Sequence, residues 1–160
     1  GDARKTINNI PSKIDFDLIY LDGFSPQKCP QLWTIEFLSK VIQKLKPQGY
    51  LITFSSAASV RMTLRNLGLE IFSIKSNLKL KNSWSQGTVG IAKFTKEKLQ
   101  KNLNFYKLSP MEEEHLLTKA SIPYRDPNLN SKSEDIIKQR LKEQLLSNLS
   151  SANEWREKWK

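Results

Sequence analysis

The stretch Phe16–Trp33, FDLIYLDGFSPQKCPQLW, decides how this sequence is interpreted. Its first part, DLIYL at Asp17–Leu21, is a continuous apolar run rather than an alternating one. Such a run is typical of a strand that is covered on both faces, as in a parallel sheet. The run stops at an Asp-Gly pair, and the prolines of the loop that follows cannot extend a strand.

Downstream of this stretch the apolar pattern alternates between helix and strand. Apolar residues spaced by three and four from Trp33 to Leu45 predict one face of a helix, which Lys46–Gly49 is expected to end. Further elements are predicted as a strand at 50–54, a helix at 60–67 capped by Gly68, and strands at 69–74 and 88–94. This order indicates an α/β fold with crossover units over a parallel sheet, and an antiparallel pair of strands at one edge.

After residue 96 the pattern becomes helical. Ser109 and the segment 131–134 each resemble a capping box, in which a serine is followed three residues later by glutamate. The second box is expected to open a helix with one apolar side, formed by Ile137, Leu141, Leu145 and Leu149. Trp155 and Trp159 are expected to pack this tail onto the domain. We therefore predict two parts, an α/β part at 1–96 and an α-helical C-terminal extension at 97–160.

Composition limits the classes of protein to consider. The chain has 160 residues with 38% apolar residues, and no apolar run approaches the about 20 residues that a membrane span needs. A single cysteine, Cys29, fits a reducing compartment and predicts a cytoplasmic protein. With one histidine and one cysteine, an imidazole and thiolate metal site is not expected.

The net charge of +10 is concentrated in the first part of the chain. Residues 1–96 hold 14 lysines and arginines against 6 acidic residues, whereas residues 97–160 hold 12 against 10. An excess of this size indicates a polyanionic partner such as nucleic acid. A basic surface that serves only solubility is the alternative, and charge alone does not choose between them.

Asp22 is the candidate functional residue of the opening stretch. In an open α/β sheet, ligands bind beyond the carboxyl ends of the parallel strands, so a carboxylate that closes such a strand faces the ligand crevice. Gly23 allows the backbone to turn sharply or to approach a ligand. The alternative is that Asp22 caps a turn or the next helix.

The neighbouring motifs favour the functional interpretation. LDGFSPQKCPQLW, after a strand and before an amphipathic helix, closely resembles a motif of the MnmC-like tRNA methyltransferase family. The sequence GDAR at Gly1–Arg4 and LKPQGYLITFSSAASVRMTLRNLG at 45–68 also resemble family segments, in the family order. The resemblance covers residues 1–75 well. It departs at Cys29, where the family usually has asparagine, which leaves a contact from that side chain in doubt.

This resemblance implies the C-terminal half of a class I, Rossmann-like methyltransferase sheet that uses S-adenosyl-L-methionine. The family methylates the exocyclic amine of 5-aminomethyl-2-thiouridine at the tRNA wobble position, so the anticodon region of tRNA is the implied partner. By resemblance, Asp2 and Ala3 contact the adenine of the cofactor, Asp22 lies at the methyl-transfer centre, and the substrate pocket is shaped by Gly23, Phe24, Ser25 and Pro26. A separate oxidoreductase is implied as the source of the aminomethyl group.

A class I methyltransferase also needs a Gly-rich turn for the cofactor, and none of the six glycines forms one. We therefore expect a fragment that starts at the end of the third strand of the family's sheet. The strand DLIYL would then lie at an edge, where it favours aggregation.

The basic run KSNLKLK with the tryptophan after it follows the third visible strand. Its lysines could contact RNA phosphates while the tryptophan stacks on a base; these residues are Lys75, Lys79, Lys81 and Trp84. A solvated hairpin with the tryptophan packed on the sheet is the alternative. Two other functions remain open for the whole chain: a methyltransferase of the same fold acting on another amine, and a non-catalytic, basic RNA-binding module.

Overall fold

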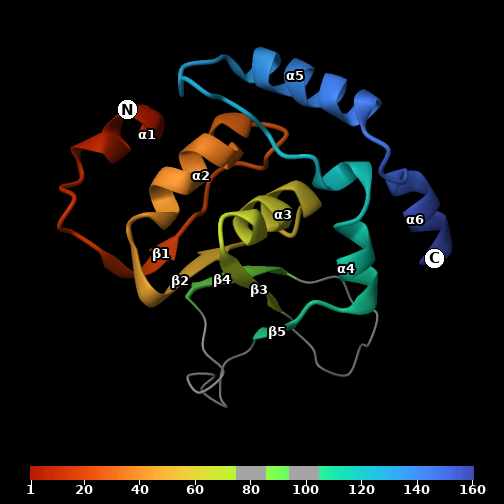
Figure 1. The fold of residues 1–160 in the computed structure, drawn as a ribbon, viewed down its shortest axis with the longest axis horizontal. Helices are drawn as coiled ribbons and strands as arrows, with labels where there is room; N and C mark the ends of the chain where they lie inside the picture. Colours follow the sequence, from red (N-terminus) through yellow and green to blue (C-terminus); the bar gives the residue numbers. More distant parts are fainter. Residues whose placement is uncertain (75–85, 94–104) are drawn as a thin grey trace.

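A five-stranded mixed sheet forms the centre of the computed structural model, which describes residues 1–74, 86–93 and 105–160 (Figure 1). The strands lie in the spatial order β1-β2-β4-β3-β5. β1 is parallel to β2, and β4 is antiparallel to both β2 and β3, so β1, β2 and β3 run in one direction. The strands are β1 (Phe16–Tyr20), β2 (Leu45–Thr53), β3 (Leu69–Ile74), β4 (Gly87–Ala92) and β5 (Phe105–Lys107).

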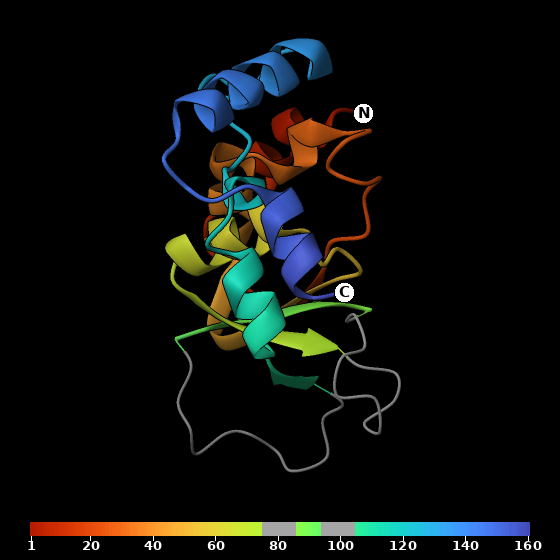
Figure 2. The same ribbon diagram turned by 90° about the vertical axis from the view of Figure 1, so that its right-hand side faces the viewer.

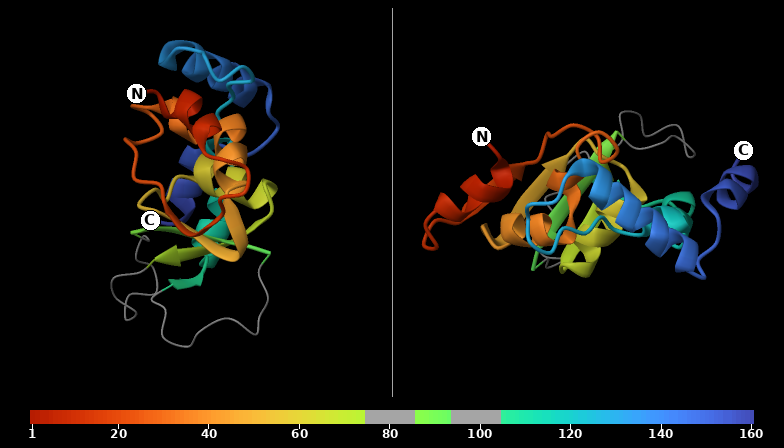
Figure 3. Two further views of the ribbon diagram at one scale, coloured as in Figure 1. Left: turned by 90° about the vertical axis from the view of Figure 1, so that its left-hand side faces the viewer. Right: turned by 90° about the horizontal axis from the view of Figure 1, so that it is seen from above.

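Three of the described helices precede β3 in the chain, and three more follow β5 and form the tail. Figure 1, Figure 2 and Figure 3 place α5 at the end of the molecule opposite β5, and α6 beside α4. Within the described residues, no helix has the length and apolar character that crossing a bilayer requires. The helices are α1 (Ala3–Thr6), α2 (Ile35–Ile42), α3 (Ala58–Asn66), α4 (Pro110–His115), α5 (Ser133–Leu146) and α6 (Ala152–Lys158), with 3₁₀ turns at Ile7–Asn9, Pro30–Trp33 and Lys119–Ser121.

The core has one cluster on each face of the sheet. Leu51 of β2 packs with Leu38 of α2 and Leu64 of α3, and all three are fully buried. Neighbouring strand residues alternate between faces, so Tyr50 and Ile52 turn to the opposite face. There they pack against a second cluster, which consists of Phe72, Val89 and Ile91.

The strand predictions are confirmed with two corrections. β3 and β4 form the predicted antiparallel pair, but β4 lies between β2 and β3, and the unpredicted β5 occupies the edge. β1 lies at the other edge, as the resemblance implies. Its expected burial on both faces was wrong, because only one face packs on the helical layer: Ile19 packs against the core, whereas Tyr20 is 70% exposed.

Two helix boundaries also differ from the predictions. α2 ends at Ile42 rather than Leu45, because the segment 45–49 belongs to β2 and pairs with β1 across an irregularity, with Gln48 at a φ of 65°. The Ser109 capping box is present, but the segment 131–134 forms none, since α5 starts at Ser133 without a side-chain cap. The apolar side predicted for α5 is not buried, and Leu145 is 81% exposed.

The tail shares the core of the α/β part. β5 pairs with β3, and Leu116, Tyr124 and Ile136 belong to the same buried cluster as Leu51. Gly68 has the positive φ of 90° that its capping role predicts. The two tail tryptophans pack against α4 as expected, each donating an indole hydrogen bond to it.

Candidate active site

The carboxyl ends of β1 and β2 meet at one rim of the sheet. The amide of Leu21 donates a hydrogen bond to the carbonyl of Ile52, 2.9 Å away, so the two chains leave the sheet side by side. Asp22 follows directly after this bond. It lines an open cavity of about 650 Å³ together with Phe54, which ends the adjacent strand segment. The remaining lining residues are Gly23, Phe24, Ser25, Lys28 and Leu32.

The carboxylate of Asp22 is available to a ligand. It is exposed, and it takes part in no hydrogen bond or ion pair with the described part of the chain. Two exposed aromatic side chains line the same cavity, Phe24 at 74% and Phe54 at 48% exposure. A cavity lined by a carboxylate and exposed aromatic rings is suited to a cationic group, which both the charge and the ring faces attract.

Buried residues anchor the loop after Asp22. Trp33 is fully buried, and its indole Nε1 donates a hydrogen bond of 2.8 Å to the carbonyl of Phe24. A Cβ on Gly23 would lie 2.8 Å from Cδ1 of Leu32, so a side chain there would push the end of the Leu32 side chain aside. Pro26 is buried as well. The loop therefore presents its exposed residues from a fixed backbone.

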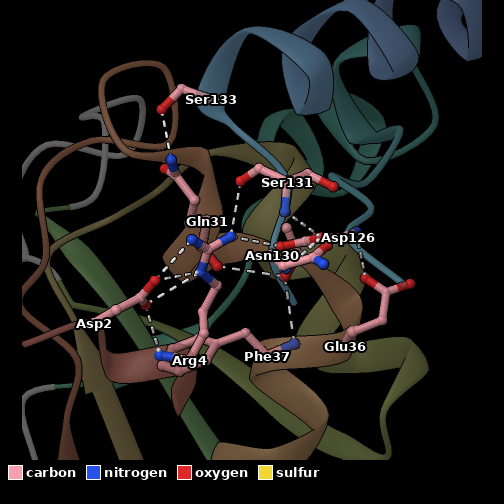
Figure 4. A network of polar contacts seen from close by, with 10 residues as sticks. Asp2, Arg4, Gln31, Glu36, Phe37, Asp126, Asn130, Ser131 and Ser133 are labelled. Carbon is pink, nitrogen blue, oxygen red and sulfur yellow. Dashed lines mark hydrogen bonds and ion pairs between the residues drawn. The ribbon is translucent and has the colours of Figure 1, made fainter. Parts of the chain in front are cut away.

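Asp2 lies in a separate network of charged groups that joins the N-terminus to the tail (Figure 4). Its carboxylate caps α1 and accepts hydrogen bonds from the Arg4 amide at 3.0 Å and from the Arg4 guanidinium, at 2.8 Å from Nη2. These hydrogen bonds lower the pKa of the Asp2 carboxyl. Arg4 also donates to the buried carboxylate of Asp126, at 2.8 Å, and to the carbonyl of Ser131.

Asp126 is the buried end of this network. It is fully buried, and burial alone would raise its pKa, but hydrogen bonds from Ser131, Arg4 and Asn130 hold the pKa of its carboxyl below the usual value. Its own amide donates to Glu36 of α2 at 2.8 Å. The loop around Asp126 is thereby fixed by pairing within the chain, and it fixes Arg4 in turn.

The structure brings together only some of the residues that the sequence singles out. Asp22 and Gly23–Ser25 line one cavity, whereas Asp2 lies in the network of Figure 4, and Ala3 begins α1 and packs against the core. Lys75, Lys79, Lys81 and Trp84 lie outside the described residues. Over residues 1–74, 86–93 and 105–160, no three His, Cys, Asp or Glu side chains gather as a metal site requires.

Sequence reasoning missed the role of Arg4 and Asp126. They are 122 positions apart, and no local pattern connects them. The only signal was the Tyr-Arg-Asp-Pro sequence at 124–127, whose charged residues indicated either internal pairing or a contact with RNA. The structure shows internal pairing, with Arg125 bound to Glu36.

Comparisons with known proteins agree with this geometry. A family model described as S-adenosyl-L-methionine-dependent methyltransferase matches residues 1–85. An uncharacterised protein of Methanocaldococcus jannaschii is 31% identical over 155 residues, covering 91% of this chain and 39% of that protein. The tRNA 5-methylaminomethyl-2-thiouridine biosynthesis bifunctional protein MnmC of Aeromonas hydrophila is 32% identical over 79 residues, covering 48% of this chain and 12% of that protein.

Among solved structures, MnmC2 of Aquifex aeolicus superposes with a TM-score of 0.74 at 26% identity, over 91% of this chain and 43% of that one. This match agrees with the α/β methyltransferase sheet expected from the sequence. The chain therefore spans about two fifths of the length of the Methanocaldococcus and Aquifex proteins.

Proposed function

Because the chain belongs to the S-adenosyl-L-methionine-dependent methyltransferase family, we propose that it is part of an enzyme that methylates the aminomethyl group of the tRNA wobble uridine, 5-aminomethyl-2-thiouridine. The observation that carries the proposal is the position of Asp22, an exposed carboxylate without a partner among the described residues, which shares a cavity with Phe24 and Phe54 at the rim where parallel strands end. The relative from Aeromonas is named for the synthesis of the methylated form of this nucleoside. The net charge of +10 suits an RNA substrate.

The residues at the rim fit the cofactor. S-adenosyl-L-methionine supplies an electrophilic methyl group on a sulfonium cation. The faces of Phe24 and Phe54 and the carboxylate of Asp22 would stabilise that positive charge. Asp2 and Ala3 are proposed to contact the adenine, from the start of α1 where Arg4 holds the Asp2 carboxylate in place.

Asp22 is proposed to orient the attacking amine. The nitrogen attacks only in its neutral form, and a carboxylate that accepts one of its N–H bonds aims the lone pair at the methyl group. The same carboxylate also favours the protonated amine, which opposes attack, so orientation is the larger part of its role. As the new N–C bond formed, the bond between the methyl group and sulfur would break and leave a neutral thioether, and Asp22 or water would take up the surplus proton of the amine. Gly23, Phe24, Ser25 and Pro26 are proposed to shape the substrate pocket.

The proposal also concerns the source of the substrate. The amine must already be present on the uridine before transfer. A separate oxidoreductase is therefore proposed to supply the aminomethyl group, and the enzyme is proposed to act in the cytoplasm.

The test is Asp22→Asn in the full-length protein. We expect turnover of labelled cofactor on undermodified tRNA to fall by at least about tenfold, and cofactor affinity to fall by less than this, because an amide still occupies the site but offers a weaker acceptor and no charge. Asp17→Asn is the matched control, since Asp17 lies on β1 with its side chain 83% exposed and paired with Lys46. Label that appears outside the wobble nucleoside would favour the methyltransferase acting on another amine, and full turnover of Asp22→Asn would remove Asp22 from the mechanism.

A further inference from the structure

A second cavity, of about 550 Å³, adjoins the cavity of Asp22. The two cavities share Ser25 and Phe54. The second one is lined by the loop after β1, by the segment 54–57 between β2 and α3 with the first residues of α3, and by tail residues from α4 to α6. A ligand that spans both cavities would thus lie across the carboxyl ends of β1 and β2.

The charges that line this second cavity are all positive. They are Lys119, Arg140 and Arg156, and no carboxylate of the described residues lines it. Neither the ammonium of Lys119 nor the guanidinium of Arg156 has a hydrogen-bond or ion-pair partner in the described part of the chain. His115, which stacks on Trp155 with ring centroids 4.2 Å apart, adds no charge at neutral pH, because burial and the nearby arginines lower its pKa to about 4.

Arg140 is held rigidly at the base of the same cavity. Its guanidinium donates to the carbonyls of Ile122 at 2.7 Å and Ala120 at 2.9 Å, and it lies 4.5 Å from the centre of the Tyr124 ring. Both hydrogen bonds go to neutral acceptors, so the positive charge remains to act on a ligand. Its position is set before any ligand arrives, which reduces the entropy lost on binding.

The opposite wall supplies neutral donors. The first residues of α3 line the cavity, and this helix has no side-chain cap at its N-terminus. Ser59, in its first turn, is only 4% exposed, and its hydroxyl makes no hydrogen bond with the described residues. The Ser59 hydroxyl, helical amides without a side-chain cap and three cations around one cavity match the acceptors and the charge of a phosphate group.

We propose that this second cavity binds the phosphodiester backbone of the RNA, next to the nucleotide whose amine reaches Asp22. The inference rests on the proposed function, and it adds the contact that places the RNA. Because the two cavities share a wall, they suit neighbouring nucleotides of one strand. Phe54 belongs to this wall, is 48% exposed and can stack on a base. Phosphate contacts of this kind position an RNA without reading its sequence.

The experiment compares two double variants of the full-length protein. Lys119→Gln with Arg156→Gln removes two charges from the cavity. Lys138→Gln with Lys142→Gln removes two charges from exposed positions on α5 that do not line it. The probe is an anticodon stem-loop with unmodified uridine at the wobble position, and its affinity is measured over a series of salt concentrations.

We expect the cavity variant to bind the hairpin at least about tenfold more weakly, and its slope of log K against log salt to decrease by about 1.4, since each phosphate contact to single-stranded RNA contributes about 0.7. The control should retain both the affinity and most of the slope. Equal effects of the two variants would overturn the proposal. So would displacement of the hairpin by equimolar uridine monophosphate or polyglutamate, which would indicate a site for small phosphates or acidic peptides.

Failure of this inference can be told apart from failure of the proposed function. Hairpin affinity needs no methyl transfer, so Asp22→Asn should bind the hairpin like the wild type. If the wild type labels the wobble nucleoside but the two double variants bind alike, only the cavity assignment fails. If the cavity variant loses affinity while the wild type transfers no methyl group to tRNA, the cavity stands and the proposed reaction fails.

Discussion

The buried ion pair between Arg61 and Glu112 should be the most sensitive point of the fold. Nη1 of Arg61 lies 3.0 Å from Oε1 of Glu112, and their side chains are 2% and 0% exposed. Arg61 also donates to the hydroxyl of Thr88 at 2.9 Å and to the carbonyl of Gly87 at 3.2 Å. The pair thereby connects α3, β4 and α4. Burial lowers the pKa of Arg61, so its charge depends on Glu112 for compensation.

Removal of one partner should therefore be much more harmful than removal of both. Arg61→Met leaves a buried carboxylate without its cation, which we expect to lower the free energy of unfolding by about 3–5 kcal/mol. Glu112→Leu should do the same, and it also removes the acceptor of the Ser109 amide, 2.9 Å away. The double variant should lose several kcal/mol less than the sum of the two, because neither charge then remains buried alone.

An exposed pair of the same chemistry provides the control. Arg65 and Glu113 join the same two helices with a 2.8 Å contact, but their side chains are 37% and 47% exposed. Arg65→Met should change the free energy of unfolding by less than about 1 kcal/mol. Urea denaturation followed by circular dichroism measures all four variants. A loss below 1 kcal/mol in Arg61→Met, or strictly additive losses in the double variant, would refute the reasoning.

Two further predictions concern the tail. Asp126→Asn should weaken cofactor binding by about three- to tenfold and leave the turnover number nearly unchanged, because Arg4 loses its charged partner in the network that holds Asp2. Calorimetry measures the cofactor affinity, and equal affinities of the variant and the wild type would contradict this prediction. His115 takes up its proton near pH 6.5 when unfolded and near pH 4 when folded, so stability should fall as pH decreases between these values. Between pH 7 and 4.5, protonation of His115 should lower the free energy of unfolding by about 2 kcal/mol. In His115→Gln this part of the decrease should be missing when the free energy of unfolding is measured by denaturation at each pH.

Local patterns were sufficient to predict the part of the fold that positions Asp22. An uninterrupted apolar run, a proline-containing loop and an amphipathic helix each follow from a few neighbouring residues, and β1 and β2 have the predicted direction. β5 was missed because a strand of three residues has no measurable periodicity. The end of α2 was misplaced because Pro47 usually ends a helix, whereas here it lies inside an edge-paired, irregular stretch of β2.

Contacts between distant segments could not be predicted in the same way. Arg4 and Asp126 carry opposite charges, but so do many pairs in a sequence with 26 basic and 16 acidic residues. Only the folded chain shows that Arg4 and Asp126 are partners. The partial burial of His115 could not be predicted for a related reason, since the tryptophan that stacks on it belongs to α6.

The cations of the second cavity come from the part of the chain that has the smaller excess of positive charge. Residues 97–160 carry almost balanced charges, yet they supply every cation of that cavity. The balance is only numerical, because Glu112, Glu113 and Glu114 are held in ion pairs with Arg61, Arg65 and Lys158. With these carboxylates engaged elsewhere, the field inside the cavity is set by nearby cations and not by the sum over the segment. An RNA site beside the rim of the sheet is therefore consistent with a tail of nearly zero net charge.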